Sequence, residues 1–305
     1  MNGPHHSCRQ RHVKPYARTD GCLLMRTPGH SQQEIVSAWD TSEHAQAYQR
    51  FCDESAYYPS ASAALVQAAR LTAGERVGDL GCGTGVTTEA VVAVLGESAQ
   101  VWAVDPAAAM LRVAQARVWP VGVRFALGDM ETLAREAAPV ALDCIVCSSA
   151  AWLAPHREGL LAQVGRALRV GGRFAISIPS EFLGESAHLL EPASQRFLST
   201  LSRLRSELGL APPAATSEPV DDYSLAAWKR DLASAGLERI ELSVHRFAMR
   251  HAEWAAHLGL PAVLTGLLPQ ATEEQRREFA KRLASESEAS AESARPWHLL
   301  VAWRT

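Results

Sequence analysis

The chain has 305 residues, of which 47% are hydrophobic, and it carries a formal net charge of −3 with a pI near 6.4. This length and content allow one large core in a soluble globular protein. The nearly balanced charge excludes the strongly basic footprint that is typical of proteins binding nucleic acid or anionic membranes. No stretch approaches the roughly twenty apolar residues that a membrane-spanning helix needs.

Residues 1–30 are rich in Arg and His and weakly hydrophobic. We expect them to form a disordered extension without a secretory signal. The six cysteines are scattered without a disulfide framework, which favours a reducing compartment and a cytoplasmic protein. Cys144 and Cys147 have the spacing of a metal or redox motif. They lie in an apolar run expected to be a strand, where side chains three apart point to opposite faces, so we interpret them as buried thiols and predict no metal site.

Residues 31–70 are expected to form an N-terminal helical lid. Apolar and aromatic spacing predicts one helix over 32–49 and a second over 60–71. Strands and helices then alternate over 71–180, the pattern of a parallel sheet with helices on both faces. The five expected strands are 76–79, 100–104, 123–126, 142–147 and 173–178.

The second half of the chain completes the sheet and carries two insertions. Residues 181–222 contain a predicted helix at 191–210 and a break at 211–214. Residues 223–305 contain a helix at 228–235 and strands at 237–247 and 298–303. The second insertion, at about 250–296, contains a helix capped by Thr272, followed by an expected exposed linker over 285–294. Long connections of this kind are usually functional or disordered, and we expect both insertions to form a helical cap over a substrate.

The most informative motif follows the first strand. Gly81, Gly83 and Gly85 form G-x-G-x-G rather than the G-x-G-x-x-G of dinucleotide folds, and Asp79 precedes them by two residues. A carboxylate at this place repels a pyrophosphate but attracts a ligand that carries an ammonium and a sulfonium. Asp105 ends the second strand, 105 − 85 = 20 residues after the last glycine, where an acid can bind ribose hydroxyls.

These residues resemble the first motifs of the class I S-adenosylmethionine-dependent methyltransferases. The segments 123–130, 142–147 and 161–178 resemble the later motifs of that family, in the same order. The resemblance implies an α/β fold with a Rossmann-like, seven-stranded, mostly parallel sheet whose last strand is inserted antiparallel. The sequence departs from the family pattern at Gly78, where a large aliphatic residue is usual. This glycine is expected to weaken strand packing.

The resemblance also implies S-adenosylmethionine as cofactor and a set of binding residues. Asp79 and the backbone of Gly81, Cys82 and Gly83 would hold its methionine end, and Asp105 would bind the ribose. The remaining implied contacts are Pro106 and Met110 beside the adenine, Asp129 on its amino group, Met130 on a ring nitrogen, Ser148 at the end of the fourth strand, and Tyr48 in the lid.

The implied reaction is methyl transfer to a small organic acceptor, most simply at the oxygen of a hydroxyl or a carboxylate, as in secondary metabolism. A hydroxyl acceptor benefits from a base, and His156 is the candidate, with a surface histidine as its alternative reading. Transfer to nitrogen or carbon, and a methyltransferase-fold protein that acts as a cyclase or binding module, remain as alternatives. Neither nucleic acid nor a membrane is an expected partner, and the acceptor and oligomeric state are left open.

Overall fold

The structure is a computed structural model that describes residues 32–137, 140–154, 156–183, 185, 188, 191–210 and 224–305. The extension expected to be disordered and the break at 211–214 lie outside these residues. The elements in chain order are α1 (Gln32–Trp39), α2 (Ser42–Glu54), α3 (Tyr57–Ala69), β1 (Arg76–Leu80), α4 (Val86–Leu95), η1 (Gly96–Ser98), β2 (Gln100–Asp105), α5 (Ala108–Gln115), β3 (Val123–Leu127), α6 (Met130–Ala137), β4 (Leu142–Ser148), η2 (Ala151–Leu153), α7 (Arg157–Ala167), β5 (Leu168–Pro179), η3 (Ser180–Leu183), α8 (Pro192–Glu207), α9 (Leu225–Ser234), β6 (Leu237–Arg250), α10 (His251–Leu258), α11 (Pro261–Leu267), α12 (Glu273–Glu286) and β7 (Glu292–Arg304).

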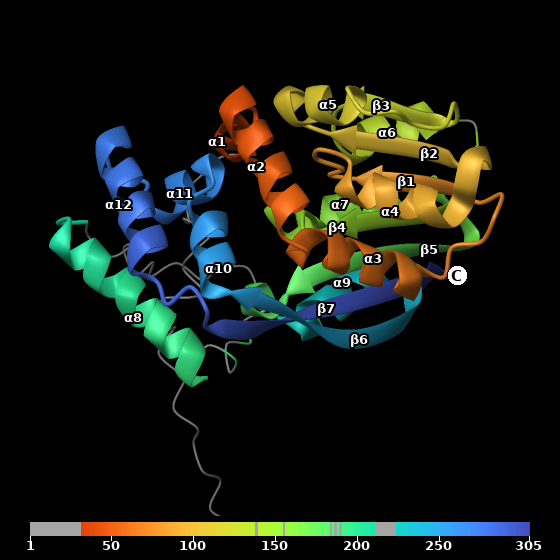
Figure 1. The fold of residues 1–305 in the computed structure, drawn as a ribbon. Coiled ribbons are helices and arrows are strands. Elements are labelled where there is room, and N and C mark those ends of the chain that lie inside the picture. The colour runs from red at the N-terminus through yellow and green to blue at the C-terminus, as the bar shows by residue number, and fades with distance from the viewer. Residues whose placement is uncertain are drawn as a thin grey trace, which may run out of the picture.

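The strands form one seven-stranded sheet in the order β3-β2-β1-β4-β5-β7-β6 (Figure 1). Strands β1 to β5 pair in parallel, and β7 is inserted antiparallel between β5 and β6. The predicted Rossmann-like sheet is therefore confirmed. Buried clusters lie on both faces of the sheet, with Cys147 in one and Cys144 in the other, as the alternation of a strand requires.

Helices α8, α10, α11 and α12 gather at one end of the sheet, where the parallel strands β1 and β2 point, and α1 and α2 lie beside them (Figure 1). We call these four helices the cap and α1 with α2 the lid. A single apolar cluster joins them to the sheet, through side chains that include Phe51, Trp254, Phe279 and Trp297. None of the helices in the described part of the chain is long and apolar enough to cross a bilayer.

The lid differs from the predicted single helix over 32–49. The chain forms two helices here, α1 and α2, which are separated by residues 40 and 41. The Thr41 side chain accepts a hydrogen bond from the His44 backbone N–H (3.1 Å) and so caps α2. Thr is a preferred capping residue because its oxygen replaces a missing intrahelical acceptor.

The second correction concerns the last strand, which was predicted over 298–303 but begins at Glu292. The expected exposed linker over 285–294 is therefore wrong, since Ser285 lies in α12 and Ser293 is buried in β7. The polar composition of 285–294 was the reason for expecting a linker, and Pro296 is an unusual residue inside a strand. This part of β7 pairs only with β6, because β5 reaches no further than the pair of Pro179 with Trp297, so the missing N–H of Pro296 is tolerated.

Gly78 does not leave a gap in the sheet. A Cβ at this position would lie 2.9 Å from Cδ2 of Leu133 and 3.0 Å from Cδ1 of Leu142. These two leucines fill the space that a larger residue would occupy. The expected weakening of packing is thus offset by its neighbours.

Candidate functional site: a cavity at the carboxyl ends of the strands

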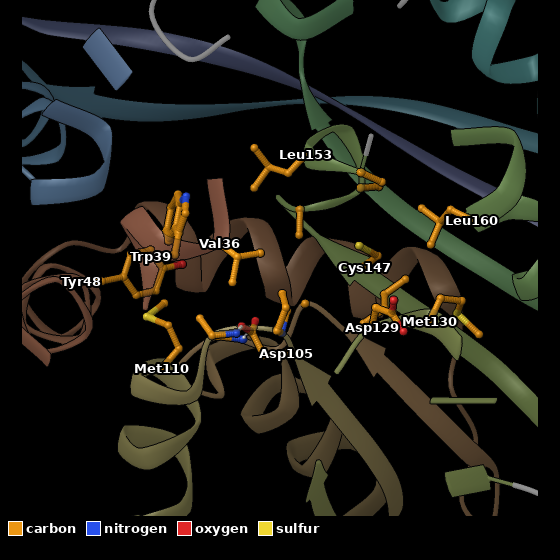
Figure 2. Close-up of a pocket in the computed structure, with 18 residues that line it drawn as sticks. Val36, Trp39, Tyr48, Asp105, Met110, Asp129, Met130, Cys147, Leu153 and Leu160 are labelled. Carbon is orange, nitrogen blue, oxygen red and sulfur yellow. Dashed lines mark hydrogen bonds between the residues drawn. The ribbon is translucent and has the colours of Figure 1, made fainter. Parts of the chain in front are cut away.

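A cavity of about 940 Å³, its open mouth included, lies between the carboxyl ends of β1, β2 and β4 and the lid helices (Figure 2). Its wall is mostly apolar. The residues lining it are Val36, Trp39, Tyr48, Leu80, Gly81, Gly83, Asp105, Pro106, Ala107, Met110, Asp129, Met130, Cys147, Ala150, Ala151, Leu153, Ala154 and Leu160. This is the edge where open α/β sheets bind ligands, because the loops there bring their backbones together.

The glycine loop forms the floor of the cavity and requires glycine. Gly81 and Gly83 have φ of +71° and +55°, and a Cβ on Gly81 would lie 2.7 Å from the Cβ of Ala150. Asp105 ties this loop to the end of β2, since its carboxylate accepts the N–H groups of Gly83 and Ala107, each at 2.8 Å. Burial raises the pKa of Asp105 to about 6.

Asp79 is fully buried next to that floor and does not itself line the cavity. Its Oδ2 accepts the Thr88 hydroxyl at 2.6 Å, while Oδ1 has no hydrogen-bond partner among the described residues. Burial, with a further contribution from Asp105, raises the pKa of Asp79 to about 7. A buried acceptor without a donor is costly, so this oxygen suits a ligand that brings a positive donor.

Four further residues implied by the resemblance line the cavity: Pro106, Met110, Asp129 and Met130. Asp129 also begins α6, because its Oδ1 accepts the backbone N–H groups of Glu131 (3.0 Å) and, more weakly, of the residue after it. Its second oxygen is not used in that turn.

Tyr48 projects from α2 toward the cavity beside Trp39 and Met110 (Figure 2). Its ring lies 6.1 Å from that of Trp39 and 5.4 Å from that of Tyr58, which stands behind it. Burial raises the pKa of the Tyr48 hydroxyl well above its ordinary value, so it stays protonated at neutral pH.

Besides Asp79, three residues predicted for the site do not line the cavity: Cys82, Ser148 and His156. Cys82 packs beneath it against Ala103 and Leu111. Ser148 turns into the interior, where its hydroxyl lies 3.1 Å from that of Ser177. The reason is the alternation along β4, which directs the preceding residue, Cys147, into the cavity instead.

His156 is exposed at the first turn of α7 and is not among the cavity-lining residues, although Leu153 and Ala154 just before it are. The placement agrees with the reading of His156 as a surface histidine. Because His156 lies outside the described wall of this cavity, its role as a base stays a prediction.

The remaining lining residues were not assigned to the site from sequence. They are Val36, Trp39, Leu80, Ala107, Cys147, Ala150, Ala151, Leu153, Ala154 and Leu160. The sequence does predict that the segment after β4 lines the site as a whole, because residues that follow a parallel strand lie at its carboxyl end. Which of its side chains face inward depends on the turn η2, which no periodicity marks.

Two buried histidines connect the cavity wall to the cap. Nδ1 of His44 accepts the backbone N–H of Ala262 at 3.1 Å, and Nε2 of His257 lies 2.8 Å from the Tyr58 hydroxyl. Burial lowers the pKa of each to about 4, so both are neutral at pH 7. Within the cap, Trp254 stacks on Phe197 with ring centroids 4.2 Å apart.

Comparison with known proteins agrees with this geometry. The family model described as a methyltransferase domain matches residues 77–172. A trans-aconitate 2-methyltransferase of Azoarcus sp. is 30% identical over 238 residues, which are 76% of this chain and 84% of that protein. The chain belongs to the class I S-adenosylmethionine-dependent methyltransferases. S-adenosylmethionine is accordingly the cofactor of this methyltransferase.

A second relative, trans-aconitate 2-methyltransferase of Methylobacterium nodulans, is 34% identical over 155 residues. This match covers 51% of the methyltransferase and 55% of the relative, about half of each. Among solved structures, phosphoethanolamine N-methyltransferase 2 of Haemonchus contortus, in complex with phosphomonomethylethanolamine and S-adenosylhomocysteine, has a TM-score of 0.52 at 16% identity. That match covers 90% of this chain and 60% of the other, and it shows the common fold.

Proposed function

We propose that this methyltransferase transfers the methyl group of S-adenosylmethionine to a carboxylate oxygen of a small organic acid. The observation that carries the proposal is that the described residues lining the cavity include no usable base. They include no His, Lys or Arg, and the Tyr48 hydroxyl is held protonated. A carboxylate needs no base, because it is already deprotonated at neutral pH, whereas a hydroxyl acceptor benefits from one.

The two carboxylates of the cavity are occupied in structural hydrogen bonds. Asp105 accepts two backbone N–H groups, and Asp129 caps α6. We assign Asp105 to the ribose and Asp129 to the adenine, and the unpartnered oxygen of Asp79 to the ammonium of the methionine end. Gly81 and Gly83 would let the backbone approach that end closely. These residues bind and orient the donor, and the cofactor supplies a methyl group on a positively charged sulfur.

The relatives point in the same direction. Both carry the name trans-aconitate 2-methyltransferase, and trans-aconitate is an organic acid. The apolar wall and the cap would exclude water and hold an acceptor in line, which are the main requirements of a methyl displacement.

The test is transfer of labelled methyl groups from S-adenosylmethionine to a panel of organic acids, alcohols and amines. Methyl esters release their label as methanol in mild alkali, whereas ethers, N-methyl and C-methyl products keep it. We expect alkali-labile label with acids only. Stable label with an alcohol or amine would contradict the proposal, and binding of S-adenosylhomocysteine without any transfer would favour the binding-module alternative.

A further inference from the structure

We propose that the acceptor is a monocarboxylic acid with an apolar body, rather than a polycarboxylate such as trans-aconitate. The inference rests on the proposed function and narrows it to one class of acid. It follows from the charges that surround the cavity.

The cavity offers no positive charge to a polyanion from any of the described residues that line it. Its lining contains no Lys, Arg or His, and its only ionisable carboxyl groups, on Asp105 and Asp129, would repel one. The other lining side chains are almost all apolar, with the Tyr48 hydroxyl and the Cys147 thiol as exceptions. One carboxylate can be balanced by the positive charge of the donor, but two more would be buried without a partner, which is strongly unfavourable.

The buried groups next to the cavity do not supply the missing charge. His44 and His257 are held neutral by burial, which lowers the pKa of each to about 4. They can donate or accept hydrogen bonds but cannot neutralise a carboxylate at pH 7. Behind them, burial raises the pKa of the Tyr57 and Tyr58 hydroxyls, and the positive charge of nearby Arg295 opposes that rise in part.

Arg295 is already engaged in a buried ion pair. Its guanidinium contacts the carboxylate of Glu181, both side chains are buried, and its Cζ lies 4.8 Å from the ring centroid of Trp254. Release of Arg295 toward a substrate would leave Glu181 charged in the interior. Beyond residue 31, the segments outside the described residues contain no Lys, Arg or His at all.

The experiment measures binding and turnover separately. Octanoate, trans-aconitate and 1-octanol are titrated by calorimetry into the full-length protein saturated with sinefungin, a donor analogue that carries an amine in place of the sulfonium. We expect octanoate to bind at least tenfold more tightly than trans-aconitate, with octanol weaker than octanoate because it lacks the charge. Equal or tighter binding of trans-aconitate would overturn the inference.

A double variant tests whether Arg295 takes part. In E181M/R295M the ion pair is removed as a unit, so no uncompensated charge is left buried. Octanoate affinity within twofold of the wild type is the expected result, whereas a loss of tenfold or more would assign the carboxylate to Arg295 and overturn the charge argument.

Turnover separates failure of the inference from failure of the proposed function. Alkali-labile methyl transfer to trans-aconitate, with kcat/KM at or above that for octanoate, would retain the proposed function and reject the narrower acceptor class. Absence of alkali-labile product with every acid would reject the proposed function itself, and the inference with it.

Discussion

At the scale of single residues, the site depends on acids that the fold removes from water. Asp79 and Asp105 are buried, and burial raises the pKa of the first to about 7 and of the second to about 6. The sequence marks both acids through their spacing to the glycines. It does not reveal that Asp79 has one oxygen satisfied by Thr88 and another without a partner, since that depends on where α4 begins.

The raised pKa of Asp79 predicts how donor binding varies with pH. In the donor-free protein, burial favours the neutral carboxyl of Asp79. This carboxyl therefore contributes folding stability that is fully present below about pH 4 and is lost as the pH rises through about 7. An ammonium beside it favours the charged form. The affinity for S-adenosylhomocysteine should therefore increase as the pH rises from 6 to 8.

Asp79→Asn should weaken S-adenosylhomocysteine binding by about tenfold or more and flatten its dependence on pH, because the amide cannot ionise. Calorimetry at several pH values measures both effects. Asp53→Asn on the exposed side of α2 is the matched control and should change neither. Unchanged affinity and slope in Asp79→Asn would remove this residue from the donor site.

At the scale of elements, the parts predicted best are those with a strong local pattern. Strands β1 to β4 are close to their predicted ranges because apolar runs mark them, whereas β5 was predicted over 173–178 and begins earlier, at Leu168. The lid was predicted as one helix, since the capping role of Thr41 is hidden in a segment with continuous helical spacing. The start of β7 was missed because its residues are polar, and their pairing with β6 leaves no local pattern in the sequence.

Besides the apolar cluster, His44 makes a polar contact between lid and cap. This side chain of α2 accepts the backbone N–H of Ala262 in the first turn of α11, where no side chain of α11 caps the helix. The neutral imidazole can accept this bond at any pH above about 4, the lowered pKa of His44. His44→Ala should leave the amide of Ala262 without its partner and speed its hydrogen exchange by about tenfold, the equivalent of roughly 1.4 kcal/mol.

Hydrogen exchange with mass spectrometry at pH 7 measures this effect in the peptide that contains Ala262. Thr41→Ala provides the control, because it removes the cap of α2 at a cost of about 1 kcal/mol but leaves His44 in place. If both variants speed the exchange of the Ala262 amide equally, then the packing of α2 as a whole, and not the His44 imidazole, protects this amide.

At the scale of the whole molecule, sequence reasoning recovered the family, the sheet and the edge that holds the cavity. It recovered the part of the cavity wall that the cofactor motifs and Tyr48 contribute, but not the part that comes from the rest of the lid and from the segment after β4. Cys147 and Trp39 were seen as a buried thiol and a helix residue, and only the packing of η2 and the lid brings them together. Gly78 shows the same limit, because the leucines that fill its space come from α6 and β4, and no local pattern connects them.

Lid, cap and sheet share one apolar cluster, which predicts that they unfold together. Phe51 of α2, Trp254 of α10 and Trp297 of β7 are all buried in it. Thermal unfolding followed by far-ultraviolet circular dichroism and by tryptophan fluorescence should therefore give coincident transitions.

Trp297→Ala should lower the free energy of unfolding by about 3–5 kcal/mol, because loss of the indole leaves a new void where lid, cap and sheet meet. The two unfolding curves should still coincide. Val170→Ala, at an exposed position of β5, should change the free energy of unfolding by less than about 0.5 kcal/mol. A fluorescence transition that precedes the loss of secondary structure would instead show that the cap opens independently of the sheet.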